Sequence, residues 1–206
     1  MTYANCYKYW RGSQSMLYEK INFLPIFDLK KELSDLLQKN KIQWKDNQIC
    51  LNCTNKDSFD YSEGVGSLRL DWQNQSTIID DNGNEKIHVP EKEIILEEKD
   101  FNFLCRSFDN TLFEDVYREL TKHFKLGRVR LMKSKPKTCL SWHKDSSKRL
   151  HFPIKTQEGC YMVIDNEVCG LEENSWYITD TTLPHTAFNA SKEDRIHLVA
   201  CILGEH

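Results

Sequence analysis

Residues 127–155 read GRVRLMKSKPKTCLSWHKDSSKRLHFPIK, short stretches of alternating polar and apolar side chains between turn residues. The same pattern continues to Leu203. Short runs with this alternation predict β-strands. We expect eight of them: Arg128–Met132, Cys139–Lys144, Leu150–Ile154, Tyr161–Asp165, Val168–Leu171, Ser175–Thr179, Thr186–Asn189 and Ile196–Leu203.

The close spacing of these strands indicates the fold class. Eight strands in about eighty residues leave no room for helices between them, which favours a double-sheet jelly roll of the cupin type. Apolar residues at helical spacing predict two earlier helices, one at Leu29–Leu37 capped by Asp28 and one at Leu112–Phe124. We therefore predict an α+β, mainly β protein: a double-stranded β-helix with supporting N-terminal helices on the outside of its larger sheet.

The length of 206 residues suits a single domain, 1–206. Within it we expect an N-terminal helical and strand elaboration, residues 1–126, and a jelly-roll catalytic core, residues 127–203. The elaboration is predicted to contain strands at Ile42–Cys53 and Gly66–Trp72.

The N-terminal region up to Phe124 is too long to be only a cap on a barrel, and it contains a polar stretch, Lys56–Asn84. It contains Asp80-Asp-Asn-Gly-Asn84, which is a strong turn signal. We predict that this stretch folds over the pocket mouth as a lid that recruits substrate. The alternative is a variable surface loop with no role.

Composition limits the partners and the compartment. The 28 basic and 31 acidic side chains are well mixed and give a net charge of -3, so a nucleic-acid partner is not expected. The mean hydropathy of -0.62 indicates a soluble protein, and neither a signal peptide nor a membrane span is expected. We predict a cytoplasmic protein, in the cytoplasm of the host cell if the chain is viral.

Eight cysteines are scattered along the chain, which favours free thiols in a reducing compartment over a disulfide framework. Cys50 and Cys53 form the one close pair among them. A zinc site would need a second Cys/His pair nearby, and none is present. We expect both to be partly buried thiols.

The core carries a possible metal site. Side chains alternate faces along a strand, so His143 and Asp145 point to the same side, and His185 follows forty-two residues after His143. Two imidazoles and one carboxylate can occupy one face of an octahedral metal and leave the other positions open, as in non-haem Fe(II) oxygenases. A single histidine on a strand is usually structural, but the combination with Arg195, ten residues after His185, favours a site.

Five stretches of the core together resemble the 2-oxoglutarate/Fe(II) oxygenases of the aspartyl/asparaginyl β-hydroxylase type, including compact versions seen in phage. The resemblance covers residues 127–203. The stretches are Gly127–Met132, Cys139–Asp145, Arg149–Ile154, Asp180–Asn189 and Glu193–Leu198.

The resemblance implies roles for individual residues. It implies three iron ligands: His143, Asp145 and His185. It also implies that Arg195 grips the far carboxylate of 2-oxoglutarate, and that Arg149 and His151 contact the same co-substrate. Arginine suits this task because its planar fork pairs bidentately with a carboxylate and keeps its charge. Some members of the asparaginyl branch lack the carboxylate ligand, so Asp145 weakens any transfer of that branch's substrate.

The expected reaction is hydroxylation of an amino-acid side chain, in a protein or peptide, with Fe(II), 2-oxoglutarate and O2. One alternative is a hydroxylase of a free amino acid or another small molecule. Another is a cupin-like metal-binding protein without turnover. A third is a zinc hydrolase with a metal-bound water, but this has no use for Arg149, His151 and Arg195 together.

Five further residues are weaker candidates. His197 either reaches the pocket beside Arg195 or packs in the core. The aromatic residues near the motif either line a substrate cleft or belong to the core, and Asn189 lies in the same region. These four are Trp142, Trp176, Tyr177 and Asn189.

Overall fold

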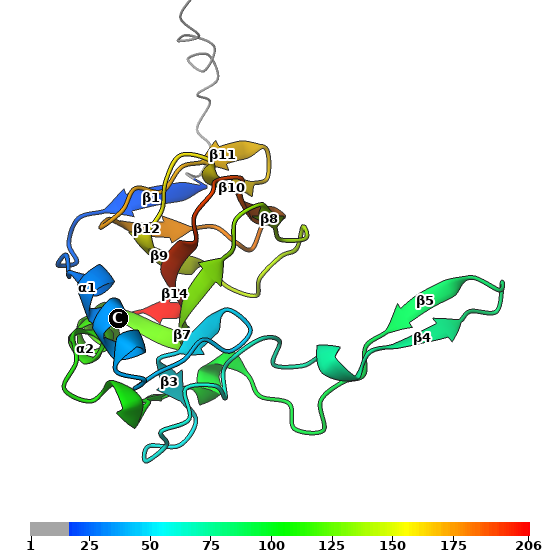
Figure 1. Cartoon of the computed structure of the whole chain (residues 1–206), viewed down its shortest axis with the longest axis horizontal. Helices are drawn as coiled ribbons and strands as arrows, with labels where there is room; N and C mark the ends of the chain where they lie inside the picture. The colour runs from blue at the N-terminus through cyan, green and yellow to red at the C-terminus, as the bar shows by residue number, and fades with distance from the viewer. Residues whose placement is uncertain (1–16) are drawn as a thin grey trace, which may run out of the picture.

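The computed structural model describes residues 17–206 and consists mainly of two antiparallel sheets (Figure 1). The larger has the strand order β1 (Tyr18–Ile21), β12 (Trp176–Thr179), β9 (Arg149–Lys155), β14 (Arg195–Glu205), β7 (Phe124–Ser134) and β2 (Gln48–Cys50). The smaller has the order β11 (Glu167–Cys169), β10 (Cys160–Ile164), β13 (His185–Asn189) and β8 (Thr138–Cys139). This mainly-β, cupin-like jelly roll confirms the predicted fold class.

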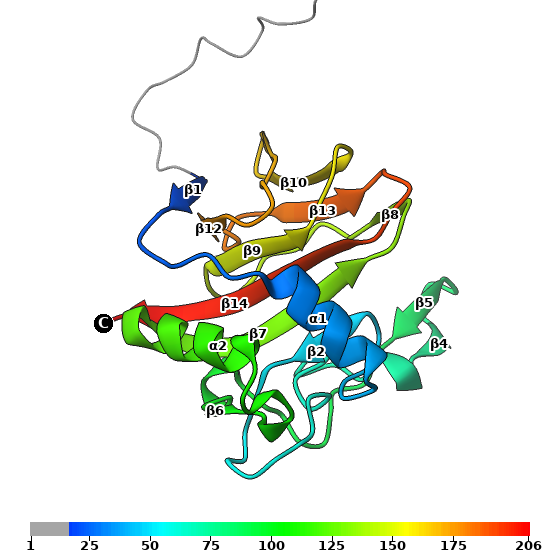
Figure 2. The ribbon, with the colours of Figure 1, turned by 60° about the vertical axis from the view of Figure 1, so that its left-hand side comes forward.

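Two helices, α1 (Leu29–Gln38) and α2 (Leu112–His123), lie across the outer face of the larger sheet (Figure 2). Both were expected, and the side chain of Asp28 accepts a hydrogen bond from a backbone N–H of the first turn of α1. Each helix buries an apolar stripe against the sheet. These stripes are Leu29, Leu33 and Leu36 of α1, and Phe113, Val116 and Leu120 of α2.

The side chains of the larger sheet alternate between two environments. On β7, Val129 and Leu131 are fully buried in the apolar core that the helices cover. Arg130 and Met132 point the opposite way, between the two sheets, where they line a cavity. The inner face of this sheet is therefore polar, although its outer face is apolar.

The expected strand Ile42–Cys53 is shorter and broken. Asp46 and Asn47 adopt positive φ angles of 48° and 61°, which makes a turn before β2. The chain then continues into β3 (Asn52–Cys53), which pairs with β6 (Phe103–Leu104) in a separate two-stranded sheet.

The strand expected at Gly66–Trp72 was wrong. Gly66 has a φ of +74°, and the hydroxyl of Ser67 accepts hydrogen bonds from the backbone of Arg69 and Leu70. These local bonds replace a ladder. The stretch instead ends in a 3-10 turn, η1 (Trp72–Asn74).

A hairpin of β4 (Ser76–Ile79) and β5 (Glu85–His88) projects away from the two sheets (Figure 1). Its turn was predicted: Asp80 accepts from the backbone of Asn82 and Asn84, and Gly83 has a φ of +80°. Every strand residue of the hairpin is exposed.

Two more 3-10 turns, η2 (Glu98–Asp100) and η3 (Arg106–Phe108), precede α2. The seven cysteines among residues 17–206 are free thiols, while Cys6 lies outside these residues. Cys50 and Cys53 are fully buried, more so than expected. None of the described helices has the length and apolar character required to cross a membrane.

Replacing Ser76–His88 by a two-glycine turn tests whether the hairpin contributes to the fold. Its side chains are exposed, so the free energy of unfolding should change by no more than about 0.5 kcal/mol. The matched change in the core, Leu131→Ala, should cost about 2–5 kcal/mol because it opens a cavity beneath the helices. Urea unfolding followed by circular dichroism measures both. A hairpin deletion as costly as Leu131→Ala would contradict the fold account.

Candidate metal centre

His143 and His185 lie opposite each other in an isolated antiparallel bridge. The backbone N–H of His143 donates to the carbonyl of His185 at 3.1 Å, and that of His185 donates to the carbonyl of His143 at 2.9 Å. Residues directly opposite in such a pair share a face. The N–H of Asp145 donates to the carbonyl of Thr181 at 2.8 Å, which fixes the next part of the loop.

This arrangement differs from the expected strand Cys139–Lys144. Strand β8 ends at Cys139, and only single backbone contacts continue beyond it, at Leu140 and His143. The segment carrying His143 and Asp145 is therefore mostly loop. The two side chains still converge, because the bridge to His185 fixes the first and the contact to Thr181 fixes the second.

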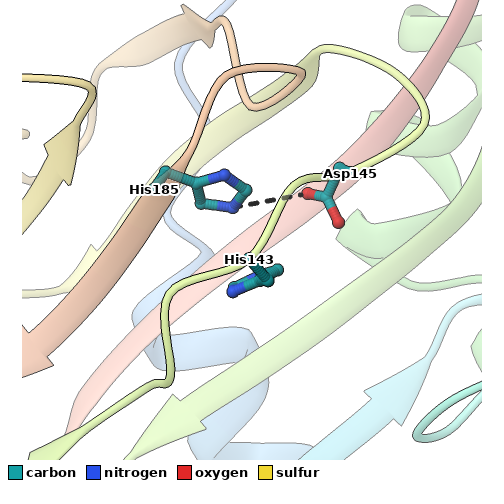
Figure 3. A group of neighbouring side chains, drawn as sticks. All are labelled: His143, Asp145 and His185. Atoms are coloured by element: carbon teal, nitrogen blue, oxygen red, sulfur yellow. Dashed lines mark ion pairs between the residues drawn. The ribbon is translucent and has the colours of Figure 1, made fainter.

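The three side chains point toward a common position (Figure 3). One candidate ligand atom from each of His143, Asp145 and His185 lies within 4.8 Å of the others. Nδ1 of His143 lies 2.8 Å from the carbonyl of Ser141, and Nδ1 of His185 lies 3.0 Å from the carbonyl of Leu183. Both Nδ1 atoms therefore donate, which leaves each Nε2 with a free lone pair. Histidine ligands of metals are commonly oriented in this way.

The carboxylate of Asp145 is fixed by a hydrogen bond from Arg149. Nε of Arg149 donates to its Oδ2 at 2.8 Å, and Nε2 of His185 lies 3.6 Å from the same oxygen. Burial raises the pKa of Asp145, but the hydrogen bond and charge of Arg149 outweigh it and hold the pKa below its ordinary value. Burial lowers the pKa of His185. A charged carboxylate and a neutral imidazole are the states that a metal requires.

A cavity of about 310 Å³ opens between the sheets beside these residues. It is lined by all six residues of the expected metal site and co-substrate site and by their neighbour His197. These are His143, Asp145, His185, Arg149, His151, Arg195 and His197. The fold therefore brings residues from β9, β13, β14 and the loop after β8 to one place.

Arg195 lines the same cavity. Its Nη2 lies 3.1 Å from Nδ1 of His197. Burial, together with the charge of Arg195, places the pKa of His197 well below its ordinary value, so His197 is neutral and its Nδ1 accepts. Burial lowers the pKa of Arg195 to about 10, so the guanidinium remains charged at neutral pH.

Several buried nitrogen atoms around this cavity have no hydrogen-bond partner within residues 17–206. Burial costs such groups free energy unless a partner satisfies them. All belong to arginines or to neutral histidines, so an anionic ligand with several acceptor oxygens would satisfy the N–H donors among them. They are Nε of Arg130, Nη1 of Arg149, both ring nitrogens of His151, Nε of Arg195 and Nε2 of His197.

Trp176 and Tyr177 do not line the cavity. They are neighbours on β12 and face opposite sides of the sheet. Trp176 packs in the helix-covered core, and its Nε1 donates to the carbonyl of Pro25 at 2.9 Å. Tyr177 belongs to a second apolar cluster, and its hydroxyl accepts from the backbone of Glu172.

Asn189 and Trp142 also lie outside the cavity lining. The fully buried Asn189 donates to the carbonyls of Ser134 and Glu193, so it fixes the turn before β14. Trp142 is 57% exposed on the loop that carries His143.

The expected lid is wrong for this structure. No residue of Lys56–Asn84 lines the cavity. Three residues at the start of β2 line the cavity instead. Asp46 and Asn47 form the turn before this strand, and Gln48 is its first residue. The hairpin that contains the second half of the expected lid extends away from the sheets (Figure 1).

Arg130 was missed as a cavity residue. Its Nη1 donates to Oε1 of Gln48 at 3.0 Å, and burial lowers its pKa to about 9. The signal was present, because Arg128, Arg130 and Met132 follow period two on a strand whose other face is Val129 and Leu131. Charged residues at alternate positions indicate a polar interior face.

The fold and site define a jelly-roll protein with a group of two histidines and one carboxylate suited to a metal. The chain belongs to the aspartyl/asparaginyl beta-hydroxylase family, whose model matches residues 28–203. It is therefore an enzyme of a family of 2-oxoglutarate- and Fe(II)-dependent hydroxylases that carries the His-x-Asp…His group.

Solved structures with which the chain shares similarity include a cupin domain from Bordetella pertussis Tohama I. The identity is 17% over 39% of this chain and 84% of that chain, with a TM-score of 0.34. Another is an oxidoreductase of the 2OG-Fe(II) oxygenase family from Burkholderia pseudomallei. There the identity is 10% over 47% of this chain and 54% of that chain, with a TM-score of 0.35. Among curated proteins, none matches the sequence.

His185→Ala should abolish stoichiometric binding of a divalent metal, because it removes the ligand whose Nε2 lies nearest to Asp145. His143→Ala should do the same, and Asp145→Ala should weaken binding less, since two imidazoles remain. Elemental analysis after anaerobic loading with Fe(II) measures the metal content. His88→Ala, on the exposed hairpin, is the control. Undiminished metal in both His143→Ala and His185→Ala would exclude this site.

Proposed function

We propose that this enzyme is a dioxygenase that uses Fe(II) and 2-oxoglutarate to hydroxylate an amino-acid side chain within a protein or peptide. One observation carries the proposal. The metal-binding group and a buried, charged arginine, Arg195, line the same cavity. A dicarboxylate that reaches a metal at one end needs a cation at the other, and Arg195 offers an Nε without a partner within the described chain.

The donor set fits Fe(II). His143, Asp145 and His185 would hold the metal as two neutral imidazoles and one carboxylate, which suits non-haem iron with open positions. When bound, Fe(II) supplies the redox chemistry that couples loss of CO2 from 2-oxoglutarate to oxidation of a C–H bond. Backbone carbonyls at both Nδ1 atoms hold the two histidines in the tautomer whose Nε2 is free to bind the metal.

The residues around the ligands would bind and orient the co-substrate. The Arg195 guanidinium would pair with the far carboxylate, and His197 holds it through the Nη2 contact. Arg149 and His151 would contact the co-substrate from β9. Nη1 of Arg149 and both ring nitrogens of His151 are buried without a hydrogen-bond partner in the described residues, although Nη1 also lies 3.6 Å from Oε1 of Glu98. Burial lowers the pKa of His151 to about 3, so this ring is a neutral donor and acceptor.

Access to the site supports a polypeptide substrate over a free amino acid. His143 is exposed, so the metal position is open to solvent on one side. A side chain of a folded or extended polypeptide can reach such a site without entering a closed chamber. Lys133, near the end of β7, and Lys135, just beyond it, also line the cavity. The substrate's identity stays a prediction.

Other functions have less support. A zinc hydrolase has no use for the buried nitrogen atoms of Arg195, Arg149 and His151 that lack a hydrogen-bond partner within residues 17–206 and lie around the same cavity. A metal-binding protein without turnover would never form succinate. We further propose a compact, phage-type member acting in the cytoplasm, of the host cell if viral. The free thiols among residues 17–206 fit a reducing compartment.

Succinate release tests the proposed function. The Fe(II)-loaded enzyme with 2-oxoglutarate and O2 is offered host-lysate protein, peptides, free amino acids and nucleic acids in turn. Protein or peptide should stimulate succinate formation most strongly, with hydroxylation detected by mass spectrometry. Stimulation by nucleic acid alone would overturn the substrate class. No succinate under any condition would favour the metal-binding protein without turnover.

Arg195→Ala should weaken 2-oxoglutarate binding by about 2–5 kcal/mol, because the far carboxylate loses a charge-assisted partner in a buried site. Arg149→Ala and His151→Ala should cost less. The absorbance of the anaerobic complex with Fe(II) and 2-oxoglutarate gives the dissociation constant. Arg69→Ala, an exposed arginine, is the control. An unchanged dissociation constant for Arg195→Ala would place the carboxylate elsewhere.

A further inference from the structure

A partly buried carboxylate from outside the jelly-roll core contacts the residues behind the metal centre. Glu98 begins η2, which packs against β7 and β14. Its carboxylate forms a bidentate ion pair with Arg128, with Nη2 of the arginine 2.9 Å from Oε1. The backbone N–H of Arg128 also donates to Oε2 at 2.8 Å. Glu98 is thus fastened to β7 through both the main chain and the side chain.

The same carboxylate faces a second arginine. Nη1 of Arg149 lies 3.6 Å from Oε1 of Glu98, an ion pair that is longer than a hydrogen bond. Gly127 permits this approach, because a Cβ added there would lie only 2.8 Å from Cβ of Glu98. A larger residue at position 127 would displace the glutamate.

Glu98 balances a cluster of buried cations. Arg128, Arg130 and Arg149 are all buried, and the charges of Arg128 and Arg149 help to lower the pKa of Arg130. Within residues 17–206, only Glu98 and Asp145 form ion pairs with these arginines. If the carboxylate of Asp145 binds a metal, Glu98 is the one carboxylate among these ion pairs that remains to balance the positive charge of the cluster.

Arg149 connects Glu98 to the metal centre. Its Nη1 faces Glu98, and its Nε donates to Oδ2 of Asp145 at 2.8 Å. One rigid guanidinium plane therefore lies between two carboxylates. We propose that Glu98 is a positioning residue of the metal centre: it holds the guanidinium of Arg149 so that Arg149 fixes Asp145 without neutralising it.

The physical reason is competition for Asp145. Without Glu98, the charge of Arg149 would be repelled by Arg128 and Arg130, and its nearest remaining partner would be Asp145. A stronger ion pair between Arg149 and Asp145 would compete with the metal for the carboxylate. Metal affinity should fall although every ligand is present. This inference rests on the metal site of the proposed function and gives residues 1–126 a role in it.

Calorimetric titration of the metal-free full chain with Mn²⁺ tests the proposal without turnover. Glu98→Gln keeps the shape of the side chain but removes its charge, and should weaken Mn²⁺ binding about tenfold, as for other residues that orient metal ligands. Glu97→Gln is the matched control, because the only ion pair of this exposed neighbour within residues 17–206 is with Lys99. It should bind Mn²⁺ as the wild type does.

Two further variants separate positioning from folding. Arg128→Met leaves the contact of Glu98 with Arg149, and should bind Mn²⁺ with nearly native affinity. The double variant Glu98→Gln/Arg128→Met removes the charges of both partners of this ion pair. Loss of both charges destabilises a fold less than loss of one, which leaves the other charge without a partner. It should fold and still show the tenfold loss. In an Arg149→Met background, Glu98→Gln should have no further effect.

The outcomes distinguish this inference from the proposed function. Native Mn²⁺ affinity in the folded double variant would overturn the role of Glu98 and leave the metal site intact. A tenfold loss that persists in the Arg149→Met background would also overturn it, because the effect would then bypass Arg149. If His185→Ala also bound Mn²⁺ with native affinity, the metal would not lie at the predicted site. That result would overturn both the metal site and the proposed function.

Discussion

The alternation of side chains along the central strands is the constraint on which the structure depends. On β7, one face carries Val129 and Leu131 into the helix-covered core, and the other carries Arg128 and Arg130 inward. β9 and β14 repeat this division. A shift of one residue in register would expose the apolar set and bury the charges against the helices. The apolar face thus stabilises the sheet, while the polar face forms the site.

The free-energy cost of burying the arginines on the polar face indicates that this face binds a ligand. Buried guanidinium groups lose hydration, and partners must compensate them. Arg128 is fully engaged, because Glu98 and the carbonyls of Gly64 and Gly66 accept from it. Arg195 is not, since its Nε has no partner within residues 17–206. A stable fold that retains such a group is best explained by a ligand that completes it, and a dicarboxylate bound to a metal does so.

Local patterns in the sequence, together with the resemblance to a known family, were sufficient for the fold class and for the metal-binding group. Strand periodicity and the His-x-Asp pair are local signals. His185 lies forty-two residues after His143, and the structure brings the three residues together. The sequence did not show which way individual side chains face or which distant residues contact each other. Trp176 and Tyr177 are adjacent aromatic residues that pack in different apolar clusters, and their residue types alone do not indicate which cluster each one joins. Glu98 contacts Arg128 thirty residues away, a contact that no local pattern encodes.

The central claim is that one cavity holds a metal at the His-Asp-His group and the far carboxylate of 2-oxoglutarate at Arg195. An anaerobic crystal structure with Mn²⁺ and N-oxalylglycine, a non-reacting analogue of the co-substrate, tests it most directly. The account predicts the metal on His143, Asp145 and His185, and the distal carboxylate of the analogue paired with Arg195. Metal bound at other side chains, or a distal carboxylate that does not contact Arg195, would contradict it.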